Sequence, residues 1–266
     1  MCIRDRPILK SKTSLPRVKI PKPNIEISIF DAIKTSTPPH TMRYDFNTTI
    51  LHKDFQSLRI PMDESWCSLT EKPGSLRLKG KESLTSTHMQ ALIARRVQHF
   101  KAEASVCIAF EPKTFQQLAG LVVYYNTGHY HYLHITTNGI DKVISIMSSN
   151  NFAIKEQEEQ CVITGAKSII LKATIHKDKL QFSYSTNHTH FKNIGNILDM
   201  SILSDDYVMK KSERYRPAFT GSFVGMCCQD LATNKQHADF SWFEYEAIKT
   251  ENKKIKVSKP EYIKLT

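Results

Sequence analysis

The chain is 266 residues long and carries 37 Lys or Arg against 26 Asp or Glu, a formal charge of +11 with a pI near 9.3. Its 40% hydrophobic residues are enough to bury a sizeable core. The longest apolar runs, such as residues 121–125, fall far short of the roughly 20 residues of a transmembrane helix. These values exclude a wholly disordered chain and one that spans a membrane.

The excess positive charge lies at the two ends of the chain. Residues 1–40 hold eight Lys or Arg against three Asp or Glu, and residues 247–266 hold six Lys against two Glu. The 23 basic and 21 acidic residues between them nearly balance. A nucleic-acid groove needs basic side chains gathered on one folded face. We therefore expect no nucleic-acid partner and no membrane partner.

Residues 1–40 contain six of the eleven prolines, too closely spaced for a helix or a central strand. From residue 42 onward, apolar and polar residues alternate with the period of two that is typical of half-buried strands. In residues 103–111, for example, Ala104, Val106 and Ile108 share one face. Turn sequences such as KPG at 72–74 and NTG at 126–128 separate the strands. The strands are predicted at 75–79, 91–99, 103–111, 118–125, 130–136, 142–147, 168–175, 180–185, 221–228 and 238–246.

This spacing, with almost no helical periodicity, predicts an all-β fold of two antiparallel sheets packed face to face. We expect a Pro-rich segment over 1–40, one β-sandwich over 41–248 and a Lys-rich tail over 249–266. The six cysteines show no zinc-ligand spacing, and the N-terminal residues include no apolar signal sequence. Reduced thiols in a cytoplasmic protein are the simplest interpretation.

Three histidines stand close together in a predicted strand. His129 and His131 share a face with Leu133, whereas His134 falls on the opposite face. Two histidines on one face could hold zinc, but no acidic residue or cysteine lies nearby to complete the site. We interpret them as hydrogen-bonded histidines in a concave sheet face, and predict no metal or cofactor.

Acidic residues cluster at Asp205–Asp206 and at Glu156, Glu158 and Glu159, in polar stretches between strands. Solvated surface is the default interpretation of such clusters. The sequence holds no Ser nucleophile elbow, phosphate-binding glycine loop or zinc-protease motif. It therefore predicts no catalytic residue within this chain.

Most of the aromatic residues are needed for the core, but residues 214–221 (RYRPAFTG) mix charge, proline and aromatic rings just before a predicted strand. Such a segment is expected to be a loop, where a ring is free to meet a partner.

Several segments follow one another in an order that is similar to a known family. They are residues 55–61 (FQSLRIP), 66–69 (WCSL), 72–80 (KPGSLRLKG), 94–100 (ARRVQHF), 115–121 (FQQLAGL), 124–127 (YYNT), 131–133 (HYL), 180–185 (LQFSYS), 219–230 (FTGSFVGMCCQD) and 238–240 (ADF). The series resembles the C-terminal concanavalin A-like β-sandwich of glycoside hydrolase family 43 β-xylosidases.

This resemblance implies a jelly roll that packs against a five-bladed catalytic propeller, which carries the three carboxylates of an inverting mechanism. Residues 1–40 would then be a linker or the remnant of that propeller, and the parent enzyme would cleave xylo-oligosaccharides as a homo-oligomer. In such enzymes a loop phenylalanine of the sandwich narrows the mouth of the active site. Phe219 matches it and is the predicted substrate-binding residue, acting by apolar closure.

The leading hypothesis is thus an accessory domain of a β-xylosidase or α-L-arabinofuranosidase type hydrolase, inactive without its propeller. A free-standing lectin-like module that binds carbohydrate is the alternative, because this fold also serves lectins. A docking module should expose an apolar surface where the propeller would sit, whereas a lectin should keep an accessible aromatic groove.

Overall fold

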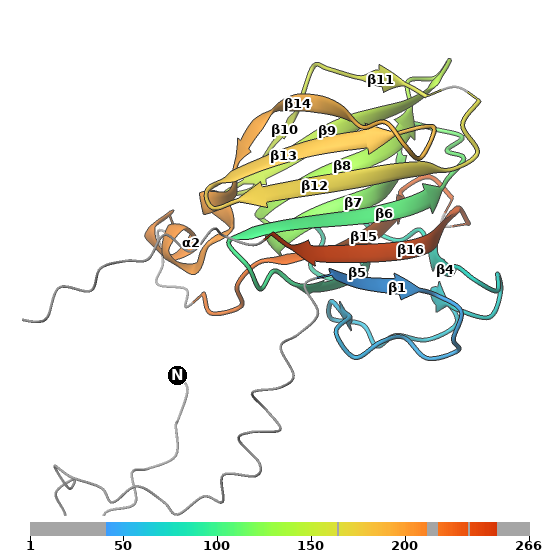
Figure 1. Cartoon of the computed structure of the whole chain (residues 1–266), viewed down its shortest axis with the longest axis horizontal. Coiled ribbons are helices and arrows are strands. Elements are labelled where there is room, and N and C mark those ends of the chain that lie inside the picture. Colours follow the sequence, from blue (N-terminus) through green and yellow to red (C-terminus); the bar gives the residue numbers. More distant parts are fainter. Residues whose placement is uncertain (1–40, 164, 212–217, 234, 249–266) are drawn as a thin grey trace, which may run out of the picture. The chain divides into compact units, whose positions relative to one another are not determined.

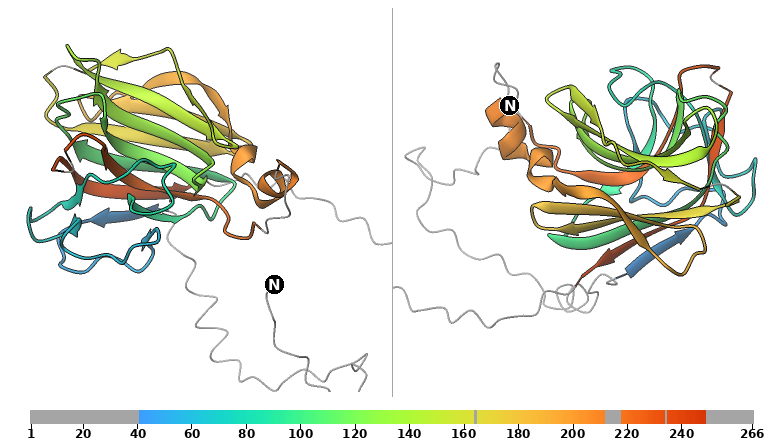
Figure 2. Two further views of the ribbon diagram at one scale, coloured as in Figure 1. Left: turned by 180° about the vertical axis from the view of Figure 1, so that it is seen from behind. Right: turned by 90° about the horizontal axis from the view of Figure 1, so that it is seen from above.

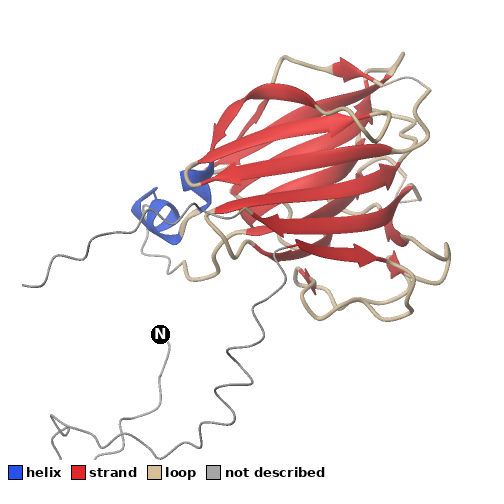
Figure 3. Ribbon diagram, in the orientation of Figure 1, coloured by secondary structure: helices blue, strands red, loops and turns tan. Residues whose placement is uncertain are grey.

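The computed structural model describes residues 41–163, 165–211, 218–233 and 235–248, which form two antiparallel sheets packed face to face (Figures 1 and 3). The predicted all-β sandwich is confirmed. Within these ranges, no helix is long and apolar enough to cross a membrane. Segments 1–40 and 249–266 lie outside the described residues, so the expected boundaries of the domain stay a prediction.

Each sheet has eight strands. The first follows the order β14 (Lys192–Asp199), β13 (Lys179–Ser185), β12 (Ile169–His176), β6 (Lys101–Ala109), β16 (His237–Ala247), β4 (Leu76–Lys79) and β3 (Cys67–Ser68), with β1 (Thr41–Asp45) also pairing β16. The second follows β10 (Ala153–Glu156), β9 (Lys142–Asn150), β8 (His129–Thr137), β7 (Gln117–Asn126), β15 (Phe223–Asp230), β5 (Ala91–Arg96) and β2 (Gln56–Ser57), with β11 (Cys161–Val162) pairing β9. Figure 2 shows the two layers edge-on.

The alternating residues of the long strands explain why the sheets pack. In β6, Ala104, Val106 and Ile108 are fully buried between the sheets, as their spacing predicted. They meet the inward residues of the second sheet, such as Leu121 and Leu133. Because successive side chains of a strand point to opposite faces, each predicted period-two run supplies one half of this core.

The ten predicted strands are all present, with ends that differ by a few residues. Sequence patterns did not predict the short strands β2, β3, β10 and β11, nor β1 and β14. They also did not predict the 3₁₀ helix η1 (Met200–Leu203) and the α-helix α2 (Asp205–Lys211). Each of these elements is too short or too irregular to show a period.

A second apolar cluster covers the outer face of the second sheet. Tyr124, Tyr130 and Tyr132 lie there beneath Leu84, and no ring is more than 3% exposed. The Tyr132 hydroxyl donates to the carbonyl oxygen of Cys227 at 3.2 Å. The tyrosines of this sheet face are therefore packed within the protein rather than lining an accessible groove.

Side chains from the segment between β10 and β11 cover the middle of the outer edge of β14. Glu159 Oε2 accepts a hydrogen bond from the amide of Gly195 at 2.9 Å, and Gln157 Oε1 accepts one from the amide of Asn196 at 3.1 Å. Backbone groups at this sheet edge that would otherwise face solvent therefore have partners within the chain.

Candidate functional site

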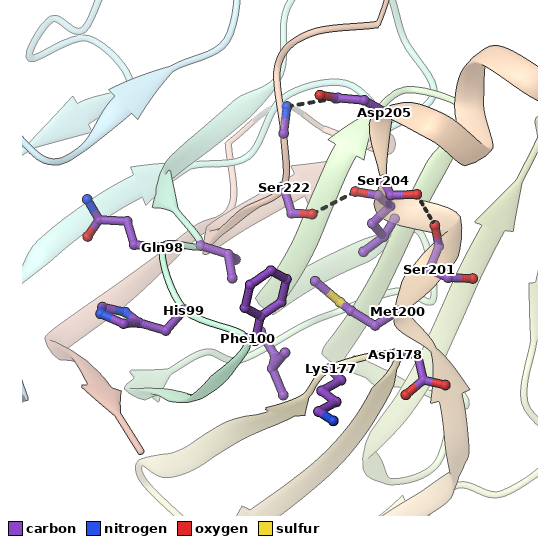
Figure 4. Close-up of a pocket in the computed structure, with 14 residues that line it drawn as sticks. Gln98, His99, Phe100, Lys177, Asp178, Met200, Ser201, Ser204, Asp205 and Ser222 are labelled. Carbon is purple, nitrogen blue, oxygen red and sulfur yellow. Dashed lines mark hydrogen bonds between the residues drawn. The ribbon is translucent and has the colours of Figure 1, made fainter. Parts of the chain in front are cut away.

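One end of the sandwich, called here the α2 end, gathers several loops and both helices. It consists of residues 97–100 between β5 and β6, residues 177–178, η1, α2 and residues 218–222 before β15 (Figure 4). β1 begins here too, because Thr41 pairs with Glu246 and the amide of Ile248 donates to the carbonyl of Lys101. Thr41, the first described residue, therefore lies at the α2 end.

Phe219, the predicted substrate-binding residue, lies in the loop before β15. Its side chain is 66% exposed, whereas the neighbouring Ala218 is buried. The rest of the segment singled out in the sequence, residues 214–217, lies outside the described residues. The ring thus projects from the α2 end, and its role at an active site stays a prediction.

A hollow of about 470 Å³ opens at the α2 end beneath this loop. Its walls are mostly apolar, with Val97, Met200 and Leu203 among them, and Ser222 adds a hydroxyl. Figure 4 shows the ring of Phe100 over the hollow beside the thioether of Met200. Phe100 is 86% exposed. An apolar hollow lined by an exposed ring is typical of a surface that binds a partner.

The corner that carries Phe100 is held by a buried arginine and a tyrosine. Arg95 is 2% exposed, and its Nη2 donates to Gln98 Oε1 at 2.7 Å. The Tyr245 hydroxyl accepts the amide of Gln98 at 3.0 Å, and its ring lies 4.2 Å from the Arg95 guanidinium. The Phe100 carbonyl accepts the amide of Lys177 at 2.6 Å. The exposed Phe100 ring therefore stands on a fixed backbone.

The loop of Phe219 is tied at three successive residues. Arg96 Nη1 donates to the carbonyl of Thr220, and Asp205 Oδ1 accepts the amide of Gly221 at 3.2 Å. Ser222 Oγ donates to the carbonyl of Leu203 at 2.7 Å, and its own carbonyl accepts the amide of Val97 at 3.0 Å. Gly221 has a φ of +68°, which favours glycine.

Asp205 was interpreted from the sequence as a solvated surface residue, but its side chain has hydrogen-bond partners within the protein. Besides the amide of Gly221, its Oδ1 accepts the hydroxyl of Tyr125 at 2.5 Å. Nothing in the local sequence signals this contact, because Tyr125 lies 80 residues away. The exposed neighbour Asp206 keeps the predicted solvated position.

The acidic cluster at 156–159 is likewise only partly solvated. Glu156 Oε1 accepts the hydroxyl of Ser145 at 3.1 Å and lies 3.7 Å from His134 Nε2. The nearby imidazole of His134 is the main cause that lowers the pKa of Glu156. Glu159 covers the β14 edge described above.

The three histidines of β8 all have hydrogen-bond partners. His129 contacts Asn126 Oδ1 at 3.0 Å, and His134 contacts the Tyr132 carbonyl at 3.3 Å. His131 bridges Ser148 Oγ at 2.8 Å and the carbonyl of Asp199 at 3.1 Å.

The histidines lie on both faces of β8, as their spacing predicted. The Leu133 face, which carries His131, packs against the first sheet, so only His134 lies outward. His131 can point inward because the hydroxyl of Ser148 and the carbonyl of Asp199, at the edge of the sandwich, form hydrogen bonds with its two ring nitrogens.

Comparison with known proteins assigns this architecture to a family. Residues 43–246 match the family model of the β-xylosidase C-terminal concanavalin A-like domain. The chain is 38% identical over 232 residues to the β-xylosidase of Bacillus subtilis strain 168, and 30% identical over 210 residues to a non-reducing end α-L-arabinofuranosidase of Bacteroides ovatus. The crystal structure of xylan β-1,4-xylosidase from Bacillus halodurans C-125 superposes with a TM-score of 0.73 at 37% identity.

The matches cover most of this chain but a minor part of each relative. They span 86% of the chain and 42% of the Bacillus subtilis protein, and 79% of the chain and 40% of the Bacillus halodurans structure. The chain thus spans about two fifths of the length of these relatives. With more than half of its residues matched by the family model, the chain belongs to the family of β-xylosidase C-terminal concanavalin A-like domains.

Proposed function

We propose that this chain is the accessory domain of a glycoside hydrolase that acts on xylo-oligosaccharides. It docks a preceding catalytic propeller on its α2 end and places Phe219 at the mouth of the active site. The domain supplies apolar closure, and the carboxylates of the hydrolysis belong to the propeller.

The observation that carries the proposal is the position of Phe219. Phe219 is 66% exposed and lies two residues before Gly221, which lines the apolar hollow together with Phe100, and β1 begins with Thr41 at the same end. The opposite end also exposes Phe115 and Ile140, but β1 does not begin there. Docking on the α2 end would place the propeller beside the start of β1.

The lectin-like alternative has less support. It requires an accessible aromatic groove, whereas Tyr124, Tyr130 and Tyr132 on the outer face of the second sheet are buried beneath Leu84. The exposed ring of Phe100 lines an apolar hollow at the α2 end, which favours docking over recognition of sugar hydroxyls.

The test is a hybrid enzyme in which residues 41–248 replace the C-terminal domain of the Bacillus subtilis relative. The hybrid should hydrolyse xylobiose, and the full 266-residue chain alone should not. Phe219→Ala should lower kcat/KM for xylobiose about tenfold by letting water into the mouth of the site. Phe115→Ala is the matched control, because Phe115 is an equally exposed ring (73%) at the opposite end.

Three results would contradict the proposal: hydrolysis of an aryl β-xyloside by the isolated chain, unchanged kinetics of the Phe219→Ala hybrid, or an equal loss in the Phe115→Ala control. Tight binding of xylan by the isolated chain would favour the lectin instead. The cytoplasmic location and the oligomeric parent expected from the sequence stay predictions.

A further inference from the structure

Asp205 joins three parts of the α2 end through a single carboxylate oxygen. Its Oδ1 accepts the hydroxyl of Tyr125, at the end of β7, and the amide of Gly221, in the loop that carries Phe219. Figure 4 shows Asp205 at the start of α2, with its carboxylate turned toward this loop. Tyr125 is 5% exposed and packs in the main core, so the carboxylate is bound to a fixed partner.

Helix capping does not account for the orientation of Asp205. Ser204 stands before α2, and its Oγ accepts the amide of Tyr207 at 3.3 Å, while its carbonyl accepts the amide of Val208 at 3.1 Å. Ser204 therefore performs the capping. Asp206 also places a negative charge in the first turn, so the favourable interaction with the helix dipole does not need Asp205.

The chemistry of the contact favours a persistent clamp. A carboxylate that accepts a hydrogen bond from a phenol hydroxyl forms a short, charge-assisted contact, as the 2.5 Å distance indicates. Burial, and then the hydrogen bond with Asp205, raise the pKa of Tyr125 to about 12. Tyr125 therefore keeps its proton at neutral pH and remains a donor.

We propose that Asp205 is a positioning residue for Phe219: by holding the amide of Gly221 against the fixed hydroxyl of Tyr125, it sets the place of the exposed ring. This inference rests on the proposed function of Phe219. Gly221 is two residues from Phe219, and Thr220 between them is held through its carbonyl by Arg96. Without Asp205, the loop loses the contact of Gly221 with the end of β7 and keeps, toward this strand, only the interaction of Thr220 with Tyr125 and the strand pairing that begins at Phe223.

The first test uses the full chain and hydrogen exchange measured by mass spectrometry. Asp205→Ala should speed exchange in a peptide covering residues 218–224 about tenfold, because the Gly221 amide loses its acceptor. Asp205→Asn should restore protection, since its amide oxygen can accept both donors. Asp206→Ala, one residue further along the same helix, is the matched control and should leave this peptide unchanged.

The second test places the same substitutions in the hybrid enzyme. Asp205→Ala should reproduce most of the loss in kcat/KM caused by Phe219→Ala, and the double variant should be no worse than Phe219→Ala alone. This non-additivity separates positioning from a general loss of stability, which would add to the effect of Phe219. Asp205→Asn should restore the kinetics.

The outcomes separate the two proposals. Unchanged exchange in Asp205→Ala, or additive losses in the double variant, would overturn the positioning role while leaving the function of Phe219 intact. Unaltered kinetics of Phe219→Ala would instead overturn the proposed function, whatever the exchange of the loop.

Discussion

Asp230, the last residue of β15, offers a sharp test of how the sandwich is held together. The residue is fully buried, and its two carboxylate oxygens accept six hydrogen bonds. Oδ1 accepts hydrogen bonds from Gln117 Nε2 at 3.2 Å and from the amides of Ala232 and Thr233 at 3.0 and 2.9 Å. Oδ2 accepts hydrogen bonds from Thr233 Oγ1 at 2.6 Å and from the amides of Lys235 and Gln236 at 2.9 Å each. This one carboxylate therefore organises the connection between β15 and β16.

The perturbation is Asp230→Asn, which keeps the size of the side chain and replaces one acceptor oxygen with a donor. Three of the six donors then lose their acceptor. At about 1 kcal/mol for each lost hydrogen bond, the free energy of unfolding should fall by about 3 kcal/mol. In a domain of this size each kcal/mol corresponds to about 2–4 °C, so Tm should fall by about 6–12 °C.

The effect should also depend on pH. Burial alone would raise the pKa of Asp230, but the hydroxyl and amide donors outweigh burial and hold the pKa far below its ordinary value. A depressed pKa in the folded state stabilises the fold above the unfolded-state pKa of about 3.9, and this contribution is lost as the pH falls. The difference between wild type and Asp230→Asn should therefore stay constant from pH 7 to pH 5 and shrink by pH 3.

The assay is urea unfolding of the full chain, followed by tryptophan fluorescence at each pH. Asp178→Asn makes the same chemical change on an exposed aspartate and should alter the free energy of unfolding by less than about 0.5 kcal/mol. A loss below about 1 kcal/mol in Asp230→Asn, or a loss that grows toward pH 3, would refute the reasoning.

Two further predictions concern the sheets. Gly225→Ala should lower the free energy of unfolding by at least about 2 kcal/mol in urea titrations. The new Cβ would lie 2.2 Å from the Ile93 carbonyl oxygen and 2.4 Å from Ala94 Cα, which are both backbone atoms of β5. An unchanged urea midpoint would contradict this prediction. Burial lowers the pKa of His131 in the folded chain. Below about pH 6.5 the unfolded chain therefore binds a proton at this residue that the folded chain does not bind. The free energy of unfolding should consequently fall from pH 7 to pH 5. His131→Gln should flatten that fall, whereas the same change at the exposed His88 should leave its slope as it is.

Sequence patterns predicted the long strands because each buries one face and so must alternate. The faces of β8 followed from spacing alone: Leu133 and His131 share one face, as predicted. β14 escaped prediction because it is an edge strand with few buried positions, and a register shift interrupts its pairing between Leu180 and Phe182 of β13. Periodicity cannot appear where only isolated positions are buried.

The candidate site was only partly predictable. Phe219 was identified through a family resemblance and the loop-like composition around it, not through its contacts. Asp205 and Tyr125 escaped because their pairing depends on the tertiary fold. Phe100 lay within a matched segment, but an apolar residue beside a strand is more often core than surface, and only the structure shows its exposure.

The covered edge of β14 bears on how copies of this domain can associate. An open strand edge invites another chain to add a strand, which is a common route to aggregation. Here a second copy would first have to displace Glu159 and Gln157 from the amides of Gly195 and Asn196. Self-association by strand addition is thus opposed at this part of the edge.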